Sequence, residues 1–147
     1  MPDREEDLRE AWRSMARLFM SDEIQQRVHL ASDAADLPHP GALKALMRLD
    51  ADDPPAMRAL AEAMHCDASY VTGLVDTLEE QGYVERRVSR SDRRMKLVQL
   101  TDAGRHAKTV ALDALLVPPK GFDRLGDDEI RSLRRLLAQA ADDYPAL

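Results

Sequence analysis

The stretch from Asp67 to Thr101 limits the folds open to this chain, because a helical pattern runs directly into a β-hairpin pattern. Asp67 is a suitable N-cap for a helix over residues 68–81. The apolar residues of that helix recur at i, i+3, i+4 and i+7: Val71, Leu74, Val75 and Leu78. Gly82 suits the left-handed position that ends a helix. Residues 83–100 then read as two strands around a polar turn, so the stretch predicts a helix followed by a hairpin.

The hairpin concentrates positive charge in an acidic chain. The whole sequence carries a formal net charge of −6, yet the segment from Val84 to Lys96 holds six basic and two acidic residues. Phosphate attraction depends on such a local patch, because salt screens charges beyond about 8–10 Å. The patch therefore favours a nucleic-acid partner. The alternative is a solvated edge hairpin whose charge only prevents aggregation.

Three helices are expected before this stretch. An apolar stripe from Leu8 to Ala31 predicts one long helix, bent near Ser21. A short helix is expected over residues 42–49. The next helix is expected to be capped by Asp53, with Pro54 at its first position. It would meet the 68–81 helix through a tight turn, which is the arrangement of a helix-turn-helix.

Two further helices are expected after the hairpin. Thr101 is suited to cap the first, and the second begins near Asp127. That last helix is expected to bury an apolar stripe: Ile130, Leu133, Leu137 and Ala140. The predicted fold class is mainly α, a winged helix-turn-helix of about six helices plus a β-hairpin wing.

Composition excludes several other classes of protein. A chain of 147 residues with 44% hydrophobic content can bury a real core. Its single cysteine forms no intramolecular disulfide, and no apolar run approaches the roughly 20 residues that cross a bilayer. With no signal-peptide pattern, a cytoplasmic protein without a membrane partner is expected. No catalytic set is visible, no cofactor is implied, and the histidines lack metal-ligand spacing.

Four runs in the middle of the chain form a combined signature. They are Leu60–Met64, Val71–Glu79, Gly82–Arg86 and Asp92–Thr101. These runs resemble the MarR family of winged-helix transcriptional regulators. The family's wing signature is Asp-x-Arg, five residues and then Leu-Thr, and the run from Asp92 to Thr101 satisfies it.

The resemblance implies a homodimer that binds a palindromic operator in double-stranded DNA. The recognition helix, residues 68–81, would enter the major groove, and the wing, residues 83–100, would reach the flanking minor groove. It often implies repression relieved by a small aromatic or anionic effector. The domain ranges expected on this basis are an N-terminal dimerisation helix (1–36), a DNA-binding lobe (37–101) and C-terminal dimerisation helices (102–147).

The expected DNA contacts lie on both parts of this unit. Those on the helix are Ser69, Tyr70, Thr72, Gly73 and Thr77, and those on the hairpin are Arg86, Arg87, Arg90, Arg93 and Arg94. The helix contacts include no Arg, Asn or Gln for bidentate base reading, so specificity should depend on the wing and on DNA shape. Asp76 is expected to pair with a hairpin arginine such as Arg86, and Arg94 with Asp92.

A ligand pocket, implied only by the family, is expected near four residues: Trp12, Met15, Phe19 and His39. Core packing also explains each of them. Cys66 is expected to be a buried, inert thiol rather than a redox sensor or metal ligand. The alternative function is a dimeric winged-helix module that contacts protein through the Tyr70 face and does not bind operator DNA.

Overall fold

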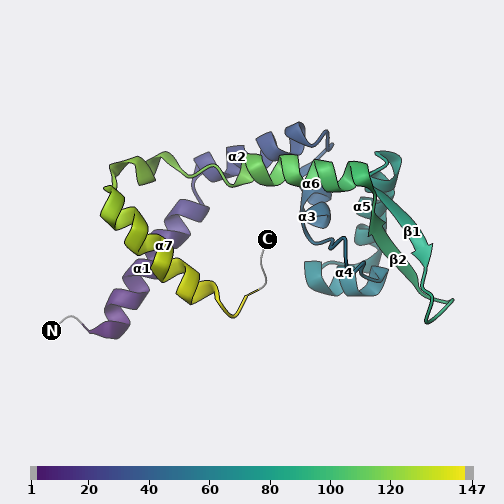
Figure 1. Ribbon diagram of the computed structural model, residues 1–147, viewed down its shortest axis with the longest axis horizontal. Helices are drawn as coiled ribbons and strands as arrows, with labels where there is room; N and C mark the ends of the chain where they lie inside the picture. Colours follow the sequence, from purple (N-terminus) through teal and green to yellow (C-terminus); the bar gives the residue numbers. More distant parts are fainter. Residues whose placement is uncertain (1–2, 145–147) are drawn as a thin grey trace. The chain divides into compact units, whose positions relative to one another are not determined.

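A computed structural model describes residues 3–144, which contain seven α-helices, one 3-10 helix and a two-stranded antiparallel sheet (Figure 1). The chain forms two compact units. The central unit is Ser21–Leu116, and the terminal unit combines Met1–Met20 with Val117–Leu147. The mainly helical, winged architecture expected from the sequence is confirmed. The expected ranges 1–36 and 102–147 extend into residues 1–2 and 145–147, which lie outside the described part.

The single long helix expected at the start is two helices. α1 spans Arg4–Phe19 and α2 spans Asp22–Ala34. Ser21 separates them as the N-cap of α2, where its side chain accepts from the Ile24 N–H at 3.4 Å. A capping hydroxyl satisfies an amide that a continuous helix would bond to a carbonyl, so the expected bend is a break.

The core of the central unit lies among α2, α3 (Pro40–Met47), α5 (Ala68–Glu80) and α6 (Asp102–Leu115). α2 and α6 run alongside each other, and small side chains line their contact: Ala31, Ala107 and Ala111. Larger aliphatic side chains fill the space beneath α5, among them Leu46, Leu60, Val71 and Leu78. The apolar stripe predicted for α5 is therefore its buried face.

The helix preceding α5 begins later than expected. α4 spans Met57–Met64 with Ala56 as its N-cap, so Asp53 and Pro54 lie outside it. The reason is tertiary: the Pro55 carbonyl accepts from the Val98 N–H at 2.8 Å, and Ala56 forms an isolated bridge with Leu97. Residues 55 and 56 therefore pair with the hairpin at a single isolated bridge, and this pairing outweighs the local preference for a Pro at the first helical position.

A tight turn joins α4 to α5. His65 ends α4 in the left-handed conformation, with φ of 53°. The Cys66 N–H then donates to the Ala61 carbonyl at 3.1 Å. Asp67 occupies the expected N-cap position of α5, but its side chain makes no capping hydrogen bond. The expected helix-turn-helix connection is confirmed, and only the capping role of Asp67 is wrong.

The wing consists of β1 (Val84–Val88) and β2 (Lys96–Leu100), paired so that Arg86 lies opposite Val98. Gly82, with φ of 74°, closes α5 as expected. The wing base is fixed to α6, because the Tyr83 carbonyl accepts from the Thr101 N–H at 3.0 Å. The Thr101 side chain caps α6 by accepting from Gly104, also at 3.0 Å.

The terminal unit contains α1, a 3-10 helix over Lys120–Arg124 and α7 over Asp127–Ala141. None of these helices has a buried residue, so the expected burial of the α7 stripe does not occur within the described chain. Many large apolar side chains of this unit are exposed: Leu8, Trp12, Phe19, Ile130, Leu136 and Leu137. Among the described residues, no helix is both long and apolar enough to cross a membrane.

Candidate nucleic-acid interface

The outer stripe of α5 is small and polar. Ser69, Thr72, Gly73 and Asp76 recur at i, i+3, i+4 and i+7, and all four are exposed on the side opposite the buried apolar stripe. A Cβ added at Gly73 would meet no atom within 4 Å. Another surface can therefore approach the helix closely at this position.

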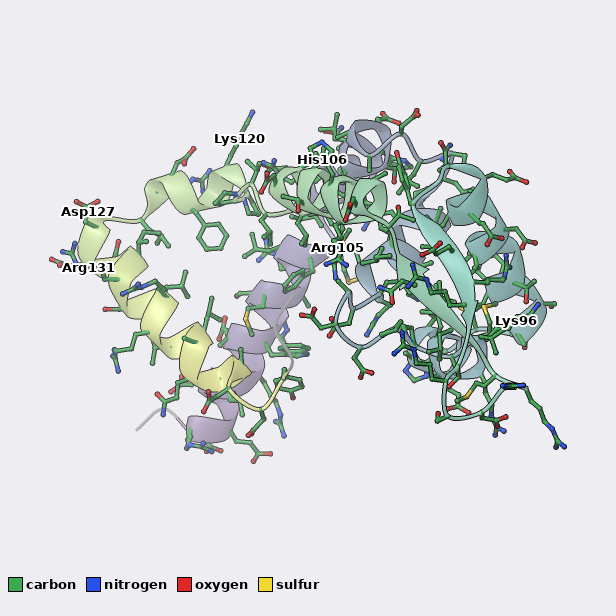
Figure 2. All side chains as sticks on the ribbon, turned by 45° about the vertical axis from the view of Figure 1, so that its right-hand side comes forward. Lys96, Arg105, His106, Lys120, Asp127 and Arg131 are labelled. Atoms are coloured by element: carbon green, nitrogen blue, oxygen red, sulfur yellow. The ribbon has the colours of Figure 1, made fainter. Side chains whose placement is uncertain are left out.

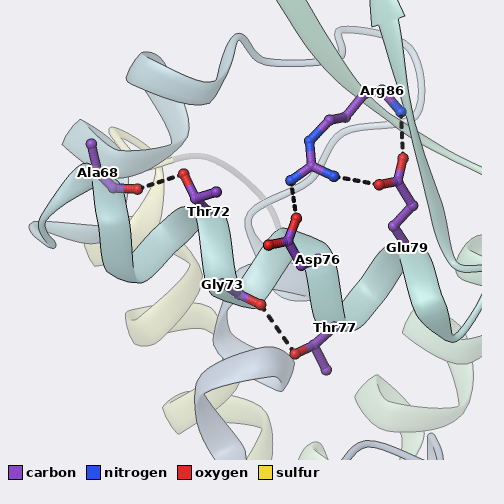
Figure 3. A network of polar contacts seen from close by, with 7 residues as sticks. All are labelled: Ala68, Thr72, Gly73, Asp76, Thr77, Glu79 and Arg86. Carbon is purple, nitrogen blue, oxygen red and sulfur yellow. Dashed lines mark hydrogen bonds and ion pairs between the residues drawn. The ribbon is translucent and has the colours of Figure 1, made fainter.

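The threonine hydroxyls of α5 are already committed as donors. Thr72 Oγ1 donates to the Ala68 carbonyl at 2.8 Å, and Thr77 Oγ1 donates to the Gly73 carbonyl at 3.1 Å (Figure 3). The sequence predicts Thr72 as a donor to DNA. In this conformation its hydroxyl offers only lone pairs, which suit the amino group of adenine or cytosine, beside a methyl group that suits thymine.

Tyr70 is partly occupied by a contact within the protein. Its side chain is on the exposed face of α5, and the residue is 52% exposed. Its hydroxyl nevertheless lies against the start of α3, because a Cβ added at Gly41 would stand 2.6 Å from that oxygen. The absence of a side chain at Gly41 therefore makes room for the phenol.

A set of short-range hydrogen bonds orders the wing tip. The side chain of Ser89 is buried, and its Oγ accepts from the N–H groups of Ser91 and Asp92 at 3.3 and 3.4 Å. Asp92 Oδ1 accepts from the Arg94 N–H at 2.9 Å, and the Ser89 N–H donates to the Met95 carbonyl at 2.8 Å. The tip is thus a turn held by side-chain to backbone hydrogen bonds, and its remaining side chains point outward.

Four cationic side chains at or beside this tip are exposed. They form no ion pair within residues 3–144: Arg90, Arg93, Arg94 and Lys96. Lys96 is the labelled residue of β2 in Figure 2. Arg87 differs, because it pairs with Glu85 on the same strand. The expected ion pair between Arg94 and Asp92 is wrong in its detail, since Asp92 binds the backbone N–H of Arg94 rather than its guanidinium.

Arg86 joins the wing to α5. Its Nη2 lies 2.5 Å from Asp76 Oδ1, its Nη1 pairs with Glu79, and its backbone N–H donates to Glu79 Oε1 at 3.2 Å (Figure 3). Burial alone would lower the pKa of Arg86, but the hydrogen bond and charge of Asp76 and the charge of Glu79 outweigh it and raise that pKa. The expected pair between Asp76 and Arg86 is confirmed.

The other candidate residues are divided between the units. Trp12, Met15 and Phe19 lie on α1 in the terminal unit, where Trp12 and Phe19 are exposed. His39 is in the central unit as the N-cap of α3, with Nδ1 accepting from the Ala42 N–H at 3.3 Å. The half-buried thiol of Cys66 donates to the Met64 carbonyl at 3.3 Å. The described residues contain no group of side chains suited to hold a metal ion.

Sequence reasoning misses three residues that shape this surface. The sequence places Ser89 in an ordinary polar turn, but its buried hydroxyl organises the tip. The sequence counts Lys96 in the charge of the hairpin but does not single it out as a DNA contact. It also does not identify Glu79 as the second partner of Arg86. The i+3 spacing of Asp76 and Glu79 on one helix could have indicated a shared partner.

Comparisons with known proteins agree with this architecture. Residues 40–96 match the model of the MarR family. Over 60 residues the chain is 42% identical to YfiV, an HTH-type transcriptional regulator of Bacillus subtilis, a match that covers 41% of this chain and 38% of that protein. The chain therefore matches well under two thirds of that relative's length.

Two solved structures show the same fold. CouR from Rhodococcus jostii RHA1, solved with p-coumaroyl-CoA, is 26% identical with a TM-score of 0.58, covering 85% of this chain and 88% of CouR. A mutant of MepR from S. aureus, solved with an oligodeoxyribonucleotide, is 18% identical with a TM-score of 0.63, covering 88% and 95%. The segment that resembles the MarR family of transcriptional regulators, residues 40–96, thus contains the helix-turn-helix and most of the wing.

Proposed function

We propose that this chain is a homodimeric regulator that binds a palindromic operator in double-stranded DNA, most simply as a repressor. The observation that carries the proposal is the ordered wing tip, whose exposed cations have no ion-pair partner in the described chain. The small polar stripe of α5 lies on the same unit as this wing. The similarity of residues 40–96 to the MarR family of transcriptional regulators supports a DNA partner, and MepR, which has the same fold, is described as bound to an oligodeoxyribonucleotide.

The distribution of charge suggests different roles in DNA binding for the helix and the wing. α5 has no Lys or Arg, whereas the wing tip has four cations. Affinity should therefore come from the wing, whose arginines suit the narrow, electronegative minor groove of A·T-rich DNA. The α5 stripe should select bases by lone pairs, methyl groups and close approach rather than by guanidinium contacts.

The exposed apolar side chains of α1 and α7 support a twofold dimer, because stripes of that kind usually mark an interface. Two recognition helices related by a twofold axis would read half-sites about one helical turn, roughly 10 bp, apart. Trp12→Glu together with Phe19→Glu should give monomers in sedimentation velocity while the central unit stays folded. A double variant that sediments as a dimer contradicts this role of α1.

Release by a small aromatic or anionic effector is the finer part of the proposal. CouR is described as bound to p-coumaroyl-CoA, which is an aromatic and anionic ligand, and the likeness at 26% identity supports an effector of that class. Trp12 is the only tryptophan of the chain, so its fluorescence reports binding directly. A panel of aromatic acids and phenols that neither quenches Trp12 nor releases DNA counts against this part.

Selection on random double-stranded DNA tests the function as a whole. The proposal expects enrichment of a palindrome with A·T-rich flanks, bound far more tightly than a scrambled sequence and with strong salt dependence. The competing function, a protein-interaction module, is favoured by the acidic character of α5. Failure to enrich any sequence, with weak binding that scrambled DNA matches, would put that function first.

A further inference from the structure

The recognition helix carries charge of the wrong sign for DNA. α5 holds Asp76, Glu79 and Glu80 and no basic residue, a formal charge of −3. Asp76 belongs to the same exposed stripe as Ser69, Thr72 and Gly73, and its side chain is 55% exposed. A carboxylate in that stripe without a cationic partner would repel DNA phosphates when the helix is close enough to contact bases.

Arg86, on the neighbouring strand β1, partly neutralises this negative charge. The side chain is only 19% exposed, and its two terminal nitrogens pair with Asp76 and Glu79 separately. Its backbone N–H also donates to Glu79, so one carboxylate binds both the main chain and the guanidinium of β1. This three-point contact fixes the hairpin to α5 and cancels charge at the same place (Figure 3).

Arg86 therefore differs in kind from the arginines of the wing tip. Together with its two carboxylates it forms a cluster with a net charge of −1. This cluster has no positive charge left to neutralise a phosphate and release a counterion from DNA. Arg90 and Arg93 are exposed and have no ion-pair partner in the described chain. The seven-residue gap between Glu79 and Arg86 places these groups on different elements, so their contact also sets the position of the wing relative to the helix.

We propose that Arg86 is a positioning residue that supports DNA binding through Asp76 and Glu79, by screening and holding them, and that it makes no phosphate contact of its own. This inference rests on the proposed function. It has a simple consequence: removing Arg86 should matter only while the two carboxylates are present.

A double-mutant cycle tests the inference. Fluorescence anisotropy on the selected operator would compare four proteins: wild type, Arg86→Ala, Asp76→Asn with Glu79→Gln, and the variant with all three changes. Arg86→Ala should weaken binding about tenfold or more, since it exposes two carboxylates to DNA; tenfold corresponds to about 1.4 kcal/mol. In the Asn/Gln background the same change should alter affinity by less than about threefold. Arg90→Ala serves as the matched control, and should cost the same in both backgrounds.

Each outcome decides the matter. Equal losses from Arg86→Ala in the two backgrounds would mean a direct phosphate contact and overturn the inference, as would a loss below threefold in the wild-type background. Circular dichroism melts of all four proteins identify any loss that reflects unfolding, and recovery of affinity in the triple variant shows that fold and interface persist. Failure of the wild type to bind any DNA is a separate result, which removes the proposed function and this inference together.

Discussion

Replacing Gly104 with alanine tests the junction that joins the wing to α6. An added Cβ would lie 1.9 Å from the Tyr83 carbonyl oxygen and 2.8 Å from its carbon. Non-bonded heavy atoms prefer about 3.5 Å, so the first turn of α6 and the Tyr83 backbone must separate by more than about 1 Å. The same carbonyl accepts from Thr101 at 3.0 Å, and the shift therefore strains that hydrogen bond as well.

The magnitude follows from three contributions. Overpacking costs about 1–3 kcal/mol, and weakening one hydrogen bond costs about 1 kcal/mol. Helix propensity opposes these losses, because alanine is favoured over glycine in a helix by up to about 1 kcal/mol. We expect Gly104→Ala to lower the free energy of unfolding by about 2–3 kcal/mol, or Tm by roughly 5–12 °C for a chain of this size.

Gly73→Ala is the matched control, since Gly73 also lies in a helix but a Cβ there meets nothing within 4 Å. It should raise the free energy of unfolding by about 0.5–1 kcal/mol. Thermal and urea unfolding followed by circular dichroism measure both variants. If Gly104→Ala melted at or above the wild-type temperature, the close approach of α6 to Tyr83 would be refuted.

Three smaller predictions concern the wing tip and the turn before α5. Asp92→Ala should speed hydrogen exchange at the tip and weaken DNA binding, whereas Arg94→Ala keeps the backbone donor and should leave tip exchange unchanged; faster exchange in both would contradict this assignment. His65→Gly should raise the free energy of unfolding by about 0.5–1 kcal/mol by relieving a left-handed non-glycine residue, and a lower urea midpoint would count against it. Cys66→Ser should cost less than about 1 kcal/mol and leave the peroxide response of DNA binding unchanged; an oxidant that releases the wild type but not the variant would assign a redox role.

Local chemistry in the sequence is sufficient to predict many features. Thr101 caps α6 and Gly82 takes the left-handed conformation, because each residue has a strong intrinsic preference for its position. The buried face of α5 follows from a simple 3.6-residue period. The pair between Asp76 and Arg86 is also predictable, since opposite charges occur on adjoining elements.

Features that depend on contacts distant in sequence are not predictable in this way. The start of α4 differs from the expected one because Pro55 binds Val98, which lies far along the chain in β2. The role of Ser89 arises only when the whole tip closes, because its hydroxyl then accepts from two backbone N–H groups of the tip. The steric need for Gly104 likewise arises only when Tyr83 lies against it. In each case a tertiary partner decides, and one sequence does not specify that partner.

The central claim is that the ordered wing tip binds DNA phosphates, and the salt dependence of affinity measures this most directly. Arg90→Ala with Arg93→Ala would be compared with wild type and with Arg13→Ala, an exposed arginine of α1, on the selected operator at several salt concentrations. The wing variant should bind more weakly, and the slope of log affinity against log salt should become shallower by about 1 for each phosphate that a wing no longer neutralises. Arg13→Ala should keep the wild-type slope. A wing variant that retains both the affinity and the slope of the wild type would contradict the claim.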